Sequence, residues 1–278
     1  MKTICISGIT GFLGKNLQKF FSEENIVVGL FRDDNIQGVL ESTNPHIIIN
    51  CAAEIYDDNS MFQSNVCLTE TILNYVKNNP KTILIHIGSS SEYGSVEGRA
   101  SSELDLINPQ DLYSATKGCA TLLCQGYARK YNLDIVIVRP YSLYGPHESD
   151  FRLIPRLTKS FIDNEPMKLV NGVHDFCYID DFVYAIDIIL KSEKREFGEI
   201  INVSNGIQYT NLRVYQYFKE IIGKEGNVNL LNEFVTYNNW ICDNKKIKIK
   251  YNWSPQYTLK LGIQKYIEYY EQTREKSN

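Results

Sequence analysis

The sequence predicts an α/β protein with a doubly wound parallel sheet and a smaller lobe formed largely by the C-terminal third of the chain. Two observations support this fold class. Short, continuous apolar runs alternate with segments of helical periodicity, as expected for a parallel sheet covered by helices on both faces. The chemically distinctive residues follow the ends of these runs, and the carboxyl ends of parallel strands are where such sheets bind ligands.

The first apolar run, at residues 3–7, leads into a turn that contains Gly8, Gly11 and Gly14. Apolar residues recur at helical spacing after this turn, so we predict a strand–turn–helix unit. Glycines at this spacing permit positive φ angles, the close approach of a pyrophosphate and tight packing of the helix on the strand. The helix N-terminus would present free N–H groups to the phosphates. A glycine turn with a purely structural role is the alternative.

Further apolar runs continue the predicted sheet. Four of them are predicted to be strands, at residues 26–31, 46–51, 82–87 and 134–138. Helical patterns lie between them at 65–76 and 113–131. After residue 146 the pattern becomes irregular, and it predicts a helix, an edge strand, a strand with its helix and a last short strand, at 152–162, 168–170, 176–190 and 200–203.

This order of elements suggests two lobes. We assign residues 1–145, together with about 176–203, to a dinucleotide-binding domain, and residues 146–175 and 204–278 to a substrate lobe. The chain from Thr210 onward is expected to be helical with loops. No repeat or low-complexity linker is present, so one compact unit is expected.

Composition excludes several functional classes. The chain has 278 residues, of which 22% are charged, and a net charge of −4, which gives no electrostatic case for binding nucleic acid or an anionic membrane. No apolar run is long enough to span a bilayer and no signal peptide is recognisable, so a cytoplasmic protein is expected. Seven cysteines without C-x-x-C spacing and four scattered histidines predict no metal site.

Tyr113 and Lys117 are the first candidates for catalysis. They lie four residues apart near the start of a predicted helix and therefore share a face. A phenol has a pKa of about 10, so a nearby ammonium or a cationic nicotinamide ring must stabilise the phenolate if it is to exchange protons near neutral pH. Ser89, at the end of a predicted strand, could reach the phenol and a substrate carbonyl; an ST-turn is the alternative for Ser89.

The Tyr-x-x-x-Lys spacing is weak evidence on its own. Tyr215 and Lys219 have the same spacing in this chain. They belong to a predicted helix of the smaller lobe, far in sequence from any glycine turn. We therefore interpret them as a coincidental match, and a surface tyrosine is the corresponding alternative for Tyr113.

The order and spacing of the motifs resemble those of the extended short-chain dehydrogenase/reductases, specifically the nucleotide-sugar epimerase/dehydratase/reductase family. The resemblance covers nearly the whole chain. Besides the three-glycine turn, the motifs that carry it are Asn50-Cys-Ala-Ala53, Asn65, Ser89-Ser-Ser-Glu-Tyr93-Gly94, Tyr113-x-x-x-Lys117, Arg139-Pro-Tyr-Ser-Leu-Tyr-Gly-Pro146 and Asp175-Phe-Cys-Tyr-Ile-Asp-Asp181.

The resemblance implies a Rossmann fold, a homodimer formed through the helices after the fourth and fifth strands, and hydride transfer between nicotinamide C4 and a ring carbon of a sugar. It implies that Tyr113 is the acid/base, that Lys117 holds the cofactor ribose and lowers the tyrosine pKa, and that Ser89 bonds the sugar oxygen. The implied cofactor-binding set also contains Gly8, Thr10, Gly11, Phe12, Leu13, Gly14, Arg32, Ala52, Ala53, Asn65 and Pro140.

On the substrate side the sequence departs from the family pattern. Family members often have Asn at the position of Ser142 and Arg at the position of His174, near the nucleotide diphosphate. A hydroxyl and an imidazole would contact phosphate more weakly, so Arg152 or Arg156 could supply the missing charge, and an exposed loop residue is the alternative for His174. The implied substrate-binding set is Ser90, Ser91, Tyr141, Ser142, Arg152, Arg156 and His174.

Two positions favour one reaction class over others. The 4,6-dehydratases of the family carry an acidic pair after the catalytic hydroxyl, and Ser90 and Ser91 occupy those positions here, which argues against elimination of water. Arg32, at the end of the second strand, suits the 2′-phosphate of NADP, whereas the neighbouring Asp33 would suit NAD. The sequence therefore favours NADP over NAD.

These features predict an NADPH-dependent reductase of a nucleotide-linked 4-keto-6-deoxy sugar that serves polysaccharide biosynthesis. A nucleotide-sugar 4-epimerase with bound NAD is the enzymatic alternative. A non-catalytic NAD(P)-sensing protein is the alternative from another class, but such proteins usually lose the tyrosine or the lysine, and both are present here.

Overall fold

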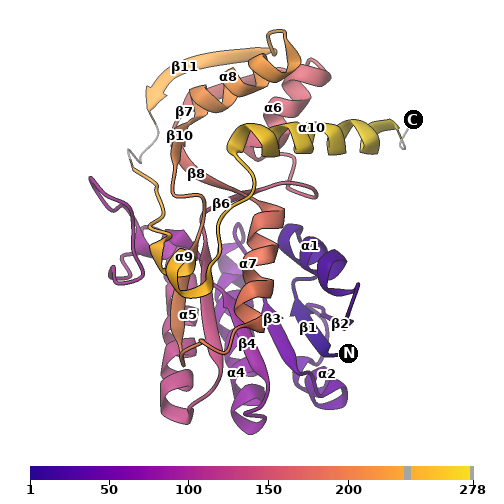
Figure 1. The fold of residues 1–278 in the computed structure, drawn as a ribbon, viewed down its shortest axis with the longest axis vertical. Coiled ribbons are helices and arrows are strands. Elements are labelled where there is room, and N and C mark those ends of the chain that lie inside the picture. Colours follow the sequence, from indigo (N-terminus) through magenta and orange to yellow (C-terminus); the bar gives the residue numbers. More distant parts are fainter. Residues whose placement is uncertain (235–238, 276–278) are drawn as a thin grey trace.

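Six parallel strands form the central sheet of the protein, seen in a computed structural model that describes residues 1–234 and 239–275 (Figure 1). The strand order is β2-β1-β3-β4-β5-β9. The strands are β1 (Thr3–Ser7), β2 (Ile26–Leu30), β3 (Ile47–Asn50), β4 (Ile83–Ile87), β5 (Ile135–Pro140) and β9 (Glu199–Val203). Every neighbouring pair is parallel, and the chain passes from β2 across β1 to reach β3. The predicted doubly wound sheet is confirmed, with its switch point between β1 and β3.

Helices cover both faces of this sheet, as the continuous apolar strands require. Along β1, Ile4 and Ile6 pack on one face and Cys5 on the other, so successive residues enter different cores. The first face is covered by α1 (Phe12–Phe21) and α7 (Ile179–Lys191), and the second by α2 (Ile36–Thr43), α4 (Leu68–Asn78) and α5 (Leu112–Tyr131). Within the described ranges, no helix is both long enough and apolar enough to cross a membrane.

The smaller lobe stands on the carboxyl edge of the sheet and has its own core (Figure 1). Its strands form one three-stranded and one two-stranded sheet, in the orders β10-β8-β6 and β11-β7. The elements are β6 (Ser142–Tyr144), α6 (Leu153–Ile162), β7 (Met167–Asn171), β8 (Val173–Tyr178), β10 (Gln208–Thr210), α8 (Asn211–Ile222), β11 (Val228–Phe234) and α10 (Leu259–Glu275). Tyr144, Phe161 and Phe218 are buried at its centre. The lobe assigned to 204–278 includes 235–238 and 276–278, which lie outside the described residues.

One C-terminal element lies with the large sheet and not with the smaller lobe. The helix α9 (Lys245–Tyr251) packs against β9, and Ile247 and Trp253 are buried in the core beneath α1 and α7. This segment of the predicted substrate lobe is therefore placed beside the dinucleotide domain. The sequence did not indicate the contact between α9 and β9, because the hydrogen-bonded partners lie 46 to 52 residues apart in the chain.

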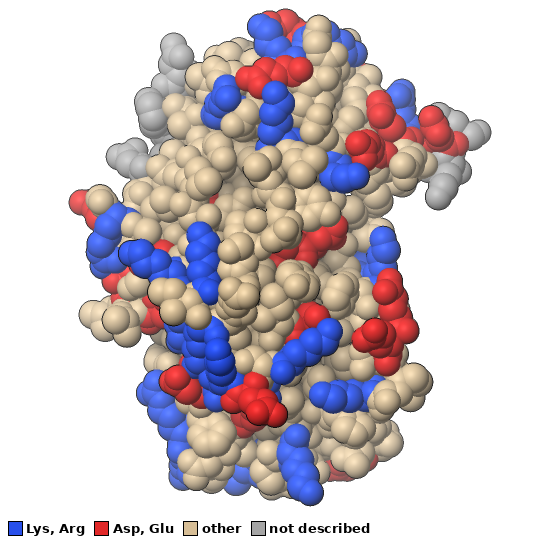
Figure 2. Space-filling view, in the orientation of Figure 1, with Lys and Arg blue, Asp and Glu red and all other residues tan. Residues whose placement is uncertain are grey.

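The basic stretch of α9 neutralises a buried carboxylate. Figure 2 shows positive and negative side chains interspersed over both lobes, with a blue group over α9. Lys246 and Lys250 pair with Glu199 of β9, at 3.4 and 2.8 Å, and the Glu199 side chain is only 3% exposed. This group of lysines therefore stabilises the edge of the sheet.

Two helical glycines provide a test of the strand–turn–helix unit. A Cβ at Gly14 of α1 would lie 2.1 Å from the Gly8 carbonyl oxygen, whereas a Cβ at Gly126 of α5 would meet no atom within 4 Å. We expect Gly14→Ala to lower the free energy of unfolding by about 3 kcal/mol or more, because backbone atoms must move. Gly126→Ala should raise it by about 0.5–1 kcal/mol, because alanine is the better helix former. Chemical denaturation measures both, and equal effects would contradict the tight packing of α1.

Candidate active site

The glycine turn after β1 has the geometry of a phosphate cradle. Gly8 has a φ of +66°, in the left-handed region, and a Cβ on it would lie 2.8 Å from the Cα of Ala52. Gly11 precedes the first residue of α1 and provides no side-chain cap, so the first N–H groups of the helix have no such partner. Backbone segments thus meet here without intervening side chains. The turn fits the pyrophosphate of a dinucleotide.

A cavity of about 620 Å³ opens from this turn along the carboxyl edge of β1, β2 and β3. The predicted cofactor residues that line it are Gly8, Thr10, Gly11, Arg32, Ala52 and Ala53. Gly14, Phe12 and Leu13 belong to the first turn of α1, and Pro140 ends β5. Arg32 is at the far end of this cavity from the catalytic helix, where the adenosine end of a dinucleotide would lie.

A buried polar network that the sequence did not predict holds the strand ends together. Ser7 Oγ donates to Asn50 Oδ1 at 2.6 Å and accepts from the Ala52 N–H at 3.1 Å. The Asn50 amide nitrogen lies 3.2 Å from His86 Nδ1, so the network spans β1, β3 and β4. Burial lowers the pKa of His86 well below its usual range. The neutral imidazole therefore accepts this hydrogen bond and keeps the three strand ends in register.

Asn65 braces the cofactor loop. It lies in a π-helical turn (Gln63–Cys67) between α3 (Asp58–Phe62) and α4, and it is buried. Its amide bonds both the N–H and the carbonyl of Glu54, at 2.8 and 3.0 Å, and its nitrogen also donates to Thr116 Oγ1 at 3.0 Å. All its polar atoms are used within the protein. The structure thus places Asn65 behind the cavity wall, where it connects the loop to α5.

The predicted catalytic side chains come together between β4 and α5. Asp111 caps α5 by accepting the Ser114 N–H at 2.7 Å, which fixes the start of the helix. The Ser89 hydroxyl is near enough to the Tyr113 phenol to act on its pKa. Lys117, one turn further on, is buried, and its Nζ donates to the backbone carbonyl of Ile87 at 2.5 Å.

Burial controls the protonation of the tyrosine and the lysine. The pKa of Tyr113 is raised, first by burial, and the nearby Ser89 hydroxyl opposes this only in part. The pKa of Lys117 is lowered by burial, against the attraction of the Glu92 carboxylate. The lowering of the Tyr113 pKa that the resemblance implied is therefore outweighed in the protein alone. At neutral pH the phenol carries its proton.

A buried ion pair determines the position of Ser89. Ser89 precedes a single 3₁₀ turn (Ser90–Tyr93), and its backbone N–H donates to Glu92 Oε1 at 2.7 Å. The other carboxylate oxygen of Glu92 accepts from Nε and Nη2 of Arg139, at 2.9 and 2.6 Å. The side chains of Arg139 and Glu92 are 1% and 0% exposed. The carboxylate thus connects the serine turn rigidly to β5.

The serine positions next to Ser89 contain no carboxylate that faces the site. Ser90 is buried, and the Ser91 hydroxyl lies 2.7 Å from the Ser89 hydroxyl. The Ser91 N–H also donates to Ser89 Oγ at 3.1 Å. Glu92, the acidic residue of this turn, points into the core. The turn therefore presents hydroxyl groups alone.

The two residues that depart from the family pattern contact each other. Ser142 Oγ lies 3.0 Å from His174 Nδ1. Burial, and next the charge of Arg152, lowers the pKa of His174 to about 4. The imidazole is therefore neutral near pH 7. Arg152, at the start of α6, is half-exposed and is the predicted substrate cation whose charge acts on both His174 and Tyr113.

The remaining predicted substrate residues occupy other environments. Arg156 is one turn beyond Arg152 and lines a separate hollow of about 370 Å³ beside Pro166. Tyr141 is 8% exposed, and its hydroxyl is 3.4 Å from the Ser101 carbonyl. Among the described residues, neither side chain forms a hydrogen bond or ion pair with Ser142 or His174. Of Arg152, Arg156 and Tyr141, Arg152 is therefore the residue that acts on this pair.

The second Tyr-x-x-x-Lys match lies far from this site. Tyr215 and Lys219 are both on α8 in the smaller lobe, and both side chains bind the Glu225 carboxylate. No glycine turn or strand end of the large sheet contacts them among the described contacts. Their positions agree with the interpretation as a coincidental match.

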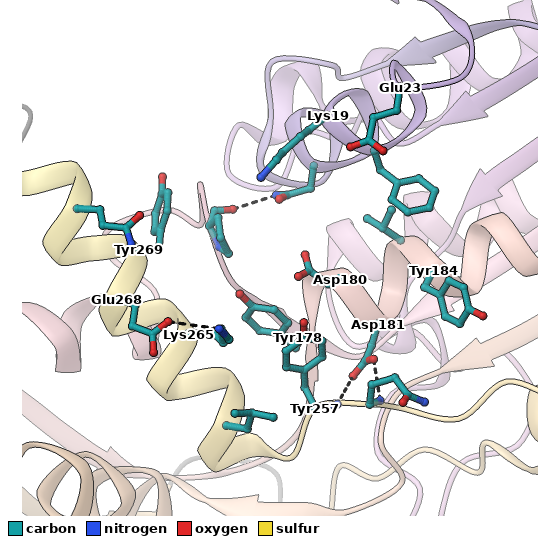
Figure 3. Close-up of a pocket in the computed structure, with 17 residues that line it drawn as sticks. Lys19, Glu23, Tyr178, Asp180, Asp181, Tyr184, Tyr257, Lys265, Glu268 and Tyr269 are labelled. Carbon is teal, nitrogen blue, oxygen red and sulfur yellow. Dashed lines mark hydrogen bonds and ion pairs between the residues drawn. The ribbon is translucent and has the colours of Figure 1, made fainter.

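Another cavity, of about 930 Å³, lies elsewhere, where α1, α7 and α10 meet (Figure 3). Lys19, Asp180 and Lys265 point into it from these three helices. The Asp181 carboxylate accepts the N–H groups of Gln256 and Tyr257, at 2.8 and 3.0 Å. The cavity thus belongs to the seam between the lobes. No cluster of three or more His, Cys, Asp or Glu suited to a metal ion occurs in the described part of the chain.

Comparisons with known proteins identify relatives along most of the chain. The model of the NAD dependent epimerase/dehydratase family matches residues 4–204. The low-salt glycan biosynthesis protein Agl12 of Haloferax volcanii is 24% identical, over 96% of this chain and 98% of that protein. The dTDP-glucose 4,6-dehydratase of Haemophilus influenzae is 25% identical, over 84% of this chain and 79% of that protein.

Solved structures share the fold. The dTDP-glucose 4,6-dehydratase from Bacillus anthracis in complex with NAD has a TM-score of 0.89 at 23% identity, covering 99% of this chain and 98% of that one. The UDP-glucuronic acid 4-epimerase from Bacillus cereus in complex with UDP-glucuronic acid and NAD has a TM-score of 0.87 at 24% identity, covering 98% of this chain and 99% of that one. Both cover the two lobes.

The Glu92–Arg139 pair can be tested by removing one charge. Glu92→Gln should lower the free energy of unfolding by about 3–5 kcal/mol, because the Arg139 charge would be left buried without its partner. Glu103→Gln is a matched control, because the half-buried Glu103 accepts the Asn202 N–H at 2.9 Å and forms no ion pair within the described residues. This control should lower the free energy of unfolding by less than about 1 kcal/mol. Equal losses in urea denaturation would contradict the role of the pair.

Proposed function

The chain belongs to the NAD dependent epimerase/dehydratase family, and on that premise we propose that it is an NAD(P)-dependent oxidoreductase that reduces the keto group of a nucleotide-linked 4-keto-6-deoxy sugar. The observation that carries this proposal is the placement of Tyr113 near Ser89, one helical turn from buried Lys117, at the edge of the sheet that also holds the glycine turn.

The reduction requires a proton donor at the carbonyl oxygen. When bound, the nicotinamide would supply a hydride to the carbonyl carbon. Ser89 and Tyr113 would bind the carbonyl oxygen, and Tyr113 would give its proton to that oxygen as the C–O double bond becomes a C–OH single bond. The ammonium of Lys117 would favour the resulting phenolate until solvent returns a proton. The raised pKa of Tyr113 supports this role, because the phenol must start protonated.

Elimination of water is not part of the proposed reaction. The relatives named as 4,6-dehydratases include that of Haemophilus influenzae, but loss of water needs an acid and a base at the sugar. Ser90 is buried, Ser91 bonds Ser89, and Glu92 is committed to Arg139. These contacts favour a redox reaction without dehydration.

For the cofactor we propose NADP. Arg32 lines the cavity at the end of β2, where it could bind a 2′-phosphate. Of the two aspartates that follow it, Asp34 lines the cavity and Asp33 does not. For the diphosphate of the substrate we propose Arg152, because His174 is neutral and Ser142 is engaged with it. A guanidinium can bind phosphate through two hydrogen bonds.

A 4-epimerase with tightly bound NAD is the second candidate. Arg32 is already paired with Glu54 at 2.9 Å, which weakens the case for NADP. The structure of the UDP-glucuronic acid 4-epimerase from Bacillus cereus contains NAD. An NAD(P)-sensing protein without activity is disfavoured by the assembled Tyr113, Lys117 and Ser89.

We also propose a homodimer formed through α5, the helix that follows β4. Leu112 and Leu122 of this helix are 47% and 57% exposed, and Cys119 between them is also exposed. Apolar residues grouped on one helix are typical of subunit contacts. A sedimentation measurement that gives only monomer at micromolar concentration would contradict this proposal.

The activity can be tested with purified protein, NADPH and a panel of UDP-, dTDP-, GDP- and CDP-linked 4-keto-6-deoxy sugars. We expect NADPH oxidation with at least one of them. Tyr113→Phe should reduce this rate by about a hundredfold or more while NADPH binding is retained. Tyr215→Phe is the matched control and should leave the rate unchanged.

Three outcomes would redirect the assignment. Interconversion of nucleotide sugars without added cofactor, with NAD extractable from the protein, would favour the epimerase. Failure of the wild-type protein to reduce any keto sugar would contradict the reductase. Equal rates for the wild-type and Tyr113→Phe proteins would contradict the catalytic role of the tyrosine.

A further inference from the structure

The guanidinium at the adenosine end of the cavity already has an anionic partner. Arg32 Nη2 lies 2.9 Å from Glu54 Oε2, and the two side chains are 71% and 17% exposed. Glu54 directly follows Ala53, which lines the cavity. Glu54 itself does not line the cavity, but its carboxylate is paired with Arg32, which does.

Glu54 is held in this position by its own loop. Its Oε1 accepts the N–H groups of Tyr56 and Ile55, at 3.1 and 3.0 Å. The bond from the Tyr56 N–H has the largest effect and the bond from Arg32 the next largest. Together they keep the pKa of Glu54 below its usual range. The carboxylate is therefore charged at neutral pH. It does not need to move to meet the guanidinium.

The backbone of Glu54 is also fixed. The Asn65 amide bonds its N–H and its carbonyl. Asn65 in turn donates to Thr116 Oγ1, and that hydroxyl donates to the Tyr113 carbonyl at 2.9 Å. The loop that carries the carboxylate is thus braced against the catalytic helix through bonds that do not use the Glu54 side chain. A change of that side chain can therefore leave the catalytic helix in place.

We propose that Glu54 is a second determinant of cofactor preference, acting against the 2′-phosphate that Arg32 would bind. The proposal rests on the proposed function, in which Arg32 is at the adenosine ribose. A phosphate that binds Arg32 must share the guanidinium with a fixed carboxylate of like charge, and like charges at this range repel each other. A 2′-hydroxyl is uncharged and meets no such repulsion. Glu54 therefore reduces the difference between NADPH and NADH affinity that Arg32 alone would produce.

Glu54→Gln tests this directly in the full-length protein. The glutamine oxygen can still accept the loop N–H groups, while its charge is gone. Titration of intrinsic fluorescence with NADPH and with NADH gives the two dissociation constants. We expect NADPH to bind about tenfold more tightly and NADH to change by less than about twofold. The gain in NADPH affinity should shrink as salt is added.

Three further variants isolate the effect. Asp58→Asn removes an equal charge from the start of α3, four residues further along the chain. Arg32 pairs with Glu54 and not with Asp58, so this variant should leave the ratio of the two constants unchanged. In an Arg32→Ala background, Glu54→Gln should no longer favour NADPH, because the two side chains act as a pair. Arg32→Ala alone should weaken the binding of NADPH more than the binding of NADH.

Each other result has a distinct meaning. Equal shifts for both dinucleotides in Glu54→Gln, or an equal shift in Asp58→Asn, would overturn the role of Glu54 and leave the proposed function standing if Arg32→Ala still selects against NADPH. Wild-type protein that binds neither dinucleotide would overturn both proposals.

Discussion

The candidate site depends above all on the buried ion pair between Glu92 and Arg139. A carboxylate and a guanidinium without water are costly to bury, and they are tolerated only when their hydrogen-bonding groups are used. Here the carboxylate also accepts the Ser89 N–H, and the guanidinium carbon lies 4.4 Å from the centre of the Tyr93 ring, whereas Nη1 of Arg139 is buried without a hydrogen-bond partner. A Cβ at Gly88 would lie 2.6 Å from Glu92 Oε1, so a side chain at this position would displace the carboxylate from the ion pair. The turn that carries the Ser89 hydroxyl is thus held by a charge that is buried within the protein.

Much of this arrangement could be predicted from local sequence, because local sequence determines strands, glycine turns and helix faces. Gly8, Tyr113 and Lys117 were recognisable from spacing, and parallel topology brings strand ends to one edge. The inward rotation of Glu92 and the brace formed by Asn65 were not recognisable. Each depends on a partner 47 or 51 residues away, and a sequence pattern contains no information on which residue that is.

In the smaller lobe, the sequence likewise could not predict the charge state of a side chain. Ser142 and His174 were both expected near a diphosphate, and they bond to each other, 32 residues apart in sequence. Burial then removes the charge of the imidazole, and among the predicted substrate-binding residues Arg152 is the cation that acts on it. A histidine in sequence is a group of unknown charge, and its environment decides whether it can attract phosphate. The weaker contact with phosphate at these positions stays a prediction, and a neutral imidazole favours it.

The protonation of Tyr113 bears on the direction of the proposed reaction. A reductase needs the phenol at the start of the reaction, whereas an epimerase must first remove a proton from a sugar hydroxyl and so needs the phenolate. Burial raises the pKa of Tyr113 and therefore favours the phenol. An oxidised nicotinamide carries a positive charge that would lower this pKa, and a reduced nicotinamide does not. The electrostatics of the protein alone therefore favour a tyrosine that donates its proton, and an epimerase on this scaffold would depend on its bound cofactor to supply the opposite bias.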